Sequence, residues 1–112
     1  MGDRSNIAIT YQNGETIYLY GHWLGQDNQR IVAEAIRENR RTQDESYFAR
    51  ILFSKMVKED IDGDTGFGIS PYKIHEDYGN PTVTVDFSDN TVMLDGWEDP
   101  VPMDKFPDLV EA

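Results

Sequence analysis

The stretch DESYFARILFSKMVKE, residues 44–59, decides the fold expected for this chain. Its apolar residues recur at the spacing of one helical face: Phe48, Ile51, Leu52 and Met56. Thr42 and Glu45 have the spacing of a capping box, in which a hydroxyl and a carboxylate satisfy backbone N–H groups of the first turn. Burying each apolar side chain stabilises the folded state by roughly 1.5–3 kcal/mol before entropy is subtracted. We therefore predict a helix here that forms the floor of the core.

A second helix is predicted over residues 28–39, where Ile31, Val32, Ala35 and Ile36 form an apolar stripe. Asp27 or Asn28 can serve as its N-cap, because both side chains accept hydrogen bonds from a first helical turn. The link of residues 40–42 is short, so the two helices should be neighbours in an αα-hairpin.

Residues 6–22 predict a β-hairpin, because two β-rich runs flank Asn13-Gly14, a dipeptide that favours a two-residue turn. That turn would place Ile9 opposite Tyr18. Tyr18 and Tyr20 would then share the face of Ile9, and Leu19 would point to the other face.

Residues 82–94 predict a second hairpin around the turn Asp89-Asn90, with Phe87 opposite Val92. Its apolar residues would share one face: Val83, Val85, Phe87, Val92 and Leu94.

The remaining tail, residues 96–112, contains Pro100, Pro102 and Pro107, which we expect to prevent regular structure. It is too apolar for a free tail, so it should lie ordered but irregular across the domain or against a partner. The prediction is therefore a single α+β domain over residues 1–112. Two antiparallel hairpins form a small sheet packed on an αα-hairpin within a core of residues 6–95, followed by an acidic, proline-rich tail, residues 96–112.

Charge and composition exclude several classes of protein. The 112 residues include 10 basic and 21 acidic side chains and no cysteine, so disulfides and thiolate metal sites are excluded. Residues 76–112 carry only Lys105 against ten acids, which disfavours direct binding to nucleic acid. The apolar runs are short, and the N-terminus lacks the pattern of a secretory signal, so no membrane association is expected.

One candidate ligand site combines aromatic and basic residues that could stack on and charge-pair with a nucleotide: Tyr18, Tyr20, His22, Trp23, Arg40 and Arg41. The alternative is that the tyrosines are half-buried sheet residues, as their β-propensity favours. Both interpretations stay open at this point.

Asp60, Asp62 and Asp64 form a candidate site for Ca²⁺ or Mg²⁺, because alternate carboxylates in a turning loop can converge on a cation. The loop departs from the EF-hand pattern, with Thr65 at the glycine position and Pro71 at the position of the bidentate glutamate. The alternative is a solvated turn, and we expect no resident cofactor. A metal-dependent enzyme built on these carboxylates and a histidine is a third functional hypothesis.

Three stretches carry a resemblance to a known group: MGDRSNI at the start, IYLYGHW at residues 17–23, and SYFARI with DGDTGFGIS at residues 46–51 and 62–70. Over roughly residues 1–87 the chain resembles small accessory proteins of tailed bacteriophages that infect actinobacteria. The resemblance implies a place in the cytoplasm of the infected bacterial host and carries no catalytic motif.

The leading functional hypothesis is a non-enzymatic phage accessory protein that binds a host or phage protein. Its contact surface would be acidic with aromatic anchors: Trp97, Phe106, Glu98 and Asp99. The alternative is a protein that binds or sequesters a nucleotide signal and so counters host defence. The hairpin edges also allow a homodimer.

Overall fold

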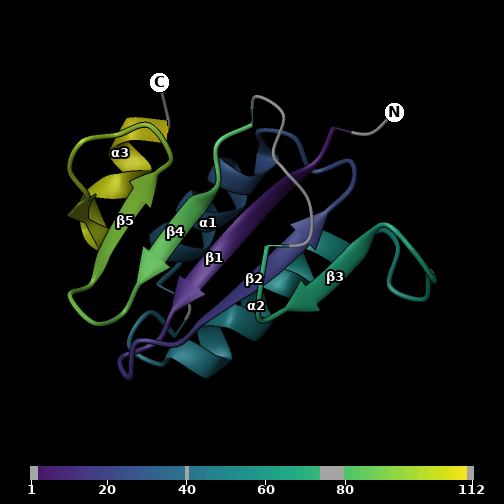
Figure 1. Ribbon diagram of the computed structural model, residues 1–112, viewed down its shortest axis with the longest axis horizontal. Helices are drawn as coiled ribbons and strands as arrows, with labels where there is room; N and C mark the ends of the chain where they lie inside the picture. The colour runs from purple at the N-terminus through teal and green to yellow at the C-terminus, as the bar shows by residue number, and fades with distance from the viewer. Residues whose placement is uncertain (1–2, 40, 74–79, 111–112) are drawn as a thin grey trace.

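The computed structural model describes residues 3–39, 41–73 and 80–110. Helices cover one face of a six-stranded sheet, and none of the helices formed by these residues lies on the opposite face (Figure 1). The helices are α1 (Asp27–Arg37), α2 (Glu45–Val57), the 3-10 turn η1 (Met103–Lys105) and α3 (Phe106–Val110). None of them is long and apolar enough to cross a membrane.

The strand order across the sheet is β3-β2-β1-β4-β5-β6. The strands are β1 (Ser5–Thr10), β2 (Thr16–Gly21), β3 (Phe67–Ser70), β4 (Val83–Asp86), β5 (Thr91–Leu94) and β6 (Val101–Pro102). β1 and β4 pair in parallel at the centre, and every other neighbouring pair is antiparallel. The predicted α+β class is confirmed, since two hairpins and two packed helices form one domain. Their parallel junction and the outer strand β6 were not predicted.

The predicted register of the first hairpin is wrong by one residue. Ile9 pairs with Ile17 and Ile7 with Leu19, and residues 11–15 form the loop, closed by the hydrogen bond from Tyr11 N–H to the Glu15 carbonyl at 2.7 Å. A slip of one residue turns every side chain of a strand to the other face. The longer loop therefore lets β2 present aliphatic side chains to the helices and turns Tyr18 to the open face.

The predicted core face of the second hairpin is confirmed, although its register is shifted by two residues. Val85 pairs with Val92, and both side chains are fully buried. A shift of two residues preserves the faces. The loop is residues 87–90, because Phe87 N–H donates to the Thr10 carbonyl at 2.8 Å and so continues the parallel pairing of β1 with β4.

α2 lies under this face as predicted, with Phe48 and Leu52 fully buried and the Phe48 ring 5.7 Å from that of Phe87. The predicted capping box is wrong. The helix begins at Glu45, and the Asp44 carboxylate accepts the Tyr47 N–H at 3.4 Å. Thr42 instead donates its hydroxyl to the Asn39 side chain at 3.1 Å.

The predicted caps of α1 are also wrong, because Gln26 is the N-cap residue and makes no side-chain cap hydrogen bond. Asn28 is fully buried and has a tertiary role. Its Nδ2 donates to the carbonyl of Asn6 at 3.1 Å and to that of Pro81 at 2.9 Å. This side chain therefore ties α1 to β1 and to the segment that enters β4.

An ion-pair cluster joins α1 to α2. Lys55 Nζ lies 2.9 Å from Glu34 Oε1 and 3.1 Å from Glu38 Oε1, and its side chain is only 14% exposed. The hydrogen bond from Lys55 lowers the pKa of Glu34. Burial opposes the charge of Lys55, but its hydrogen bonds to the two carboxylates outweigh burial and raise the pKa of the ammonium group.

Residues 101–110 of the C-terminal tail are regular, contrary to prediction, whereas residues 96–100 are irregular as predicted. This segment packs on the domain, as was also predicted. Pro102 ends the edge strand β6, and Pro107 lies in the first turn of α3, where helices tolerate a missing N–H. Phe106 is fully buried in the core. α3 contacts α1, with Arg37 Nη2 3.5 Å from the Pro107 carbonyl.

Candidate functional site

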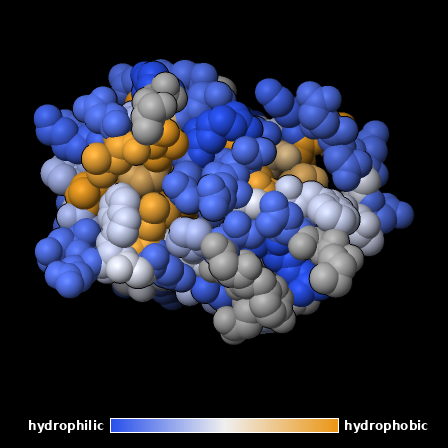
Figure 2. Space-filling view, turned by 90° about the horizontal axis from the view of Figure 1, so that it is seen from above, coloured by the Kyte–Doolittle hydropathy of each residue, from blue (hydrophilic) through white to orange (hydrophobic). Residues whose placement is uncertain are grey.

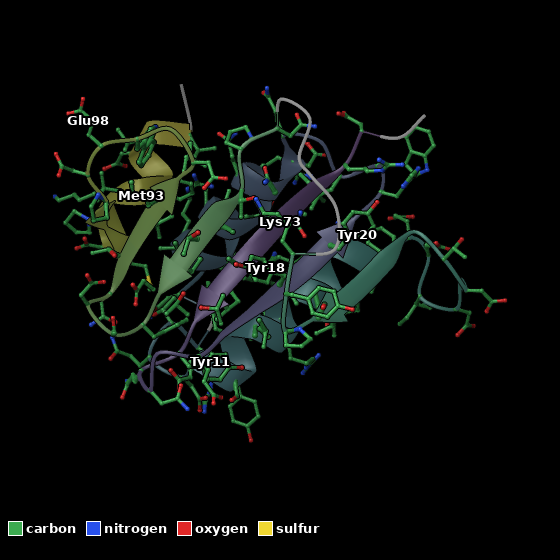
Figure 3. The ribbon with its side chains drawn as sticks, viewed as in Figure 1. Tyr11, Tyr18, Tyr20, Lys73, Met93 and Glu98 are labelled. Carbon is green, nitrogen blue, oxygen red and sulfur yellow. The ribbon has the colours of Figure 1, made fainter. Side chains whose placement is uncertain are left out.

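Exposed carboxylates gather at the β5–β6 side of the sheet, which we call the acidic edge. It comprises the β4–β5 turn, the β5–β6 loop, η1 and α3, and its exposed acids are Asp89, Asp95, Glu98, Asp99, Asp104 and Asp108. Figure 3 shows Glu98 at this edge, far from β3. Between residues 80 and 110 the only basic side chain is Lys105. Lys73 contributes a cation from outside this range, 3.6 Å from Asp95. The acidic edge therefore carries a strong net negative charge.

An apolar patch lies on the same side of the molecule, by α3, with hydrophilic residues around it (Figure 2, left). Leu109 is 54% exposed, and Trp97 and Val110 are partly buried against the core. The Trp97 ring lies 6.3 Å from the Phe106 ring, so the buried phenylalanine supports the tryptophan from beneath.

The four predicted contact residues therefore differ in their accessibility to a partner. Glu98 and Asp99 are exposed, and Trp97 is partly accessible. Phe106 cannot reach a partner, because the core encloses it completely. Leu109 was missed, since its exposure depends on how α3 packs on α1.

A hollow of about 480 Å³ lies at the other end of the acidic edge, between the α1–α2 link, the β4–β5 turn and η1. Ile36 and Met103 contribute apolar surface to it. Its polar lining includes the amides and carboxylates of Asn39, Gln43, Asn90, Asp89 and Asp104. No basic side chain lines the hollow in the described part of the chain.

Two of the residues that line this hollow hold a left-handed backbone, Asn39 at φ 56° and Asn90 at φ 59°. Asparagine tolerates this conformation better than most residues, and such positions are enriched at functional sites. The lining combines oxygen acceptors with amide groups, which suits a guanidinium or ammonium group and disfavours a phosphate. Sequence reasoning missed the hollow because three distant segments build it.

The predicted nucleotide site is divided by the fold. Tyr18 and Tyr20 lie on the sheet face turned away from the helices (Figure 3). The Tyr20 hydroxyl lies 2.9 Å from His22 Nδ1, and the His22 ring centroid lies 5.1 Å from that of Trp23, which is 69% exposed. These rings form a cluster at the end of β2.

Arg41 is not part of that cluster. It lies in the α1–α2 link, with its guanidinium 4.8 Å from the Tyr47 ring centroid and 3.2 Å from the Asp44 carboxylate. The start of α2 contacts the β1–β2 loop through the Gln12 N–H and Glu45, 2.8 Å apart, which is the end of β2 opposite to His22. Arg40 lies outside the described residues.

Asp60, Asp62 and Asp64 are exposed in the loop between α2 and β3. The Gly63 N–H donates to the Asp60 carbonyl at 3.1 Å, which closes a tight turn. In residues 3–39, 41–73 and 80–110, no three histidine or carboxylate side chains gather as metal ligands would. Metal binding at this loop stays a prediction.

Comparisons with protein-family models, with curated proteins and with solved structures find no match for this chain.

Proposed function

We propose that this protein is a non-enzymatic phage accessory protein whose acidic edge binds a basic surface of a host or phage protein. The observation that carries this proposal is the meeting of three features along one edge: exposed carboxylates, the apolar patch at Leu109 and Trp97, and the hollow beside Asp104. The proposed setting is the cytoplasm of the infected bacterial host, which the resemblance suggests.

The three features have separate physical roles in binding. The carboxylates speed encounter with a basic partner, because long-range attraction raises the association rate and fades with salt. Leu109 and Trp97 supply apolar area, which determines how long a complex lasts. The hollow can receive a lysine or arginine side chain of the partner, with carboxylate and amide oxygens as acceptors.

The test compares three baits in affinity capture from an actinobacterial host lysate, followed by calorimetry with the purified captured protein. The edge variant carries Glu98→Lys and Asp99→Lys, and the matched control carries Asp62→Lys and Asp64→Lys. All four positions are exposed, so both variants change the net charge equally and neither disturbs the core.

We expect the edge variant to bind at least about tenfold more weakly, and the control to bind like the wild type at moderate salt. Equal weakening of both variants would show that only the net charge matters. An unaffected edge variant, or capture of no protein at low salt, would contradict the proposal.

A second candidate function is nucleotide binding at the ring cluster, because the exposed Trp23 beside His22 offers a stacking surface at the end of β2. A ligand that binds the folded state raises the melting temperature. We expect such a rise for one member of a nucleotide panel and its loss in Trp23→Ala. No rise across the panel would remove this candidate.

A further inference from the structure

The two edges of the sheet are built differently. β6 has two residues, ends in a proline and continues directly into η1, so it offers little backbone to another strand. β3 has the sequence FGIS, with neither lysine nor proline inside the strand. Beyond β3 the sheet has no further strand among the described residues. Natural edge strands are often protected by charge, proline or shortness. β3 is short and is followed directly by Pro71, but its own four residues carry neither a charge nor a proline.

The backbone of β3 points a regular set of N–H and carbonyl groups away from β2. His22 N–H donates to the Gly66 carbonyl at 2.8 Å, which identifies this position as a hydrogen-bonded pair of the antiparallel ladder. The next such pairs join Gly68 to Tyr20 and Ser70 to Tyr18. Because hydrogen-bonded pairs alternate, Phe67 and Ile69 point their N–H and carbonyl groups away from β2.

Apolar side chains accompany these backbone groups. Ile69 is 60% exposed although it shares the helix side of the sheet with the partly buried Phe67. The exposed large hydrophobic residues of β3 and the segments that adjoin it are Trp23, Ile61, Ile69 and Tyr72. Only two other large hydrophobic residues are exposed in the rest of the described chain.

We propose that two copies of this chain pair through β3 about a two-fold axis. In the antiparallel register centred on Gly68, Phe67 of one copy exchanges both backbone hydrogen bonds with Ile69 of the second copy, and the axis repeats this pair. This register uses every outward group of Phe67 and Ile69. The same pairs bring the Ile69 side chain against the phenylalanine of the second copy, so the strand is complementary to itself.

The charge distribution favours a second copy at this edge. Residues 1–75 carry 9 basic and 11 acidic side chains and are nearly balanced, although the whole chain has a net charge of -11. The acidic edge lies at the opposite end of the sheet from β3 (Figure 1). A dimer through β3 therefore keeps the most repulsive surfaces far apart and displays an acidic edge at each end.

Sedimentation velocity over a range of concentrations tests this dimer. Ile69→Lys places a charge at the centre of the pairing strand, and Leu109→Lys is the matched control, because it makes the same change at another exposed position. We expect the wild type and the control to dimerise, and Ile69→Lys to do so at least about tenfold more weakly. Circular dichroism verifies that both variants are folded. A monomeric wild type, or a dimer indifferent to Ile69→Lys, would overturn the proposal.

A disulfide tests the register. The chain has no cysteine, and the backbone of Gly68 does not have a positive φ, so Gly68→Cys introduces one thiol without backbone strain. Non-hydrogen-bonded partners have Cα atoms about 4.5 Å apart, within the range that a disulfide spans. We expect oxidation to yield a covalent dimer of Gly68→Cys and little of Leu109→Cys. The reverse pattern would show pairing through another surface. The oxidation is carried out on the purified chain without a partner, so this outcome is independent of partner binding at the acidic edge.

Discussion

Replacing Asn28 with alanine should remove a large part of the stability of this domain, although Asn28 lies in the first turn of a helix with a polar sequence around it. Its side chain is fully buried and donates to the carbonyls of Asn6 and Pro81. Alanine would delete both hydrogen bonds and leave a small void among α1, β1 and the entry to β4.

The magnitude follows from the environment of each acceptor. A typical hydrogen bond contributes about 0.5–1.5 kcal/mol net, and Asn28 donates two of them. The bond to Asn6 is buried and the bond to Pro81 is part-buried, so the second loss is smaller. We expect Asn28→Ala to lower the free energy of unfolding by about 1–3 kcal/mol, from a total of about 5–15 kcal/mol for domains of this kind.

Urea denaturation followed by far-UV circular dichroism measures this loss. Gln26→Ala is the control, because Gln26 is exposed and makes no cap hydrogen bond, and it should stay within about 0.5 kcal/mol of the wild type. An Asn28→Ala variant equally close to the wild type would refute the reasoning.

Asn28→Asp provides a second test, because it predicts the direction in which stability changes with pH. A carboxylate there would face two carbonyl oxygens in the interior, which raises its pKa above the unfolded value of about 3.9. The unfolded chain then releases its proton at lower pH than the folded chain. The stability of this variant should fall as the pH rises from about 4 through the folded pKa. A flat profile would contradict the placement of this side chain.

Two further substitutions examine the C-terminal segment and the helix pair. Phe106→Ala should lower the free energy of unfolding by about 3–5 kcal/mol because the ring is fully buried, whereas Leu109→Ala should lower it by under about 0.5 kcal/mol. Similar losses at both positions would contradict the packing of α3. Lys55→Met should cost about 1 kcal/mol, since the carboxylates of Glu34 and Glu38 remain partly hydrated. The pKa of Glu34 is lowered and that of Lys55 is raised. The difference in the free energy of unfolding between the wild type and Lys55→Met is therefore fully present between about pH 4.5 and pH 10.5. Denaturation at several pH values should show the difference shrink as the pH falls through the pKa of Glu34, and a constant difference would refute it.

Local patterns determined much of the secondary structure. Residues 45–57 form a helix as the spacing of Phe48 and Leu52 predicts. An apolar stripe at helical spacing is buried by packing against any one apolar surface, so the helix does not depend on the details of the fold. The core face of the second hairpin was also predictable, since alternation alone assigns Val85 and Val92 to one side, whatever the loop length. The acidic character of the C-terminal third can be read directly from composition.

Tertiary structure decided the rest, because each remaining feature depends on a choice between local alternatives that only packing can make. The helix layer selected the aliphatic face of β2 over the tyrosine face, against the turn that Asn13-Gly14 favours. Asn28, a candidate cap in the sequence, is buried and links three segments through its hydrogen bonds. Phe106, a candidate contact residue, is buried in the core. The hollow and the edge formed by β3 arise where distant segments meet or end, so no window of sequence contains them.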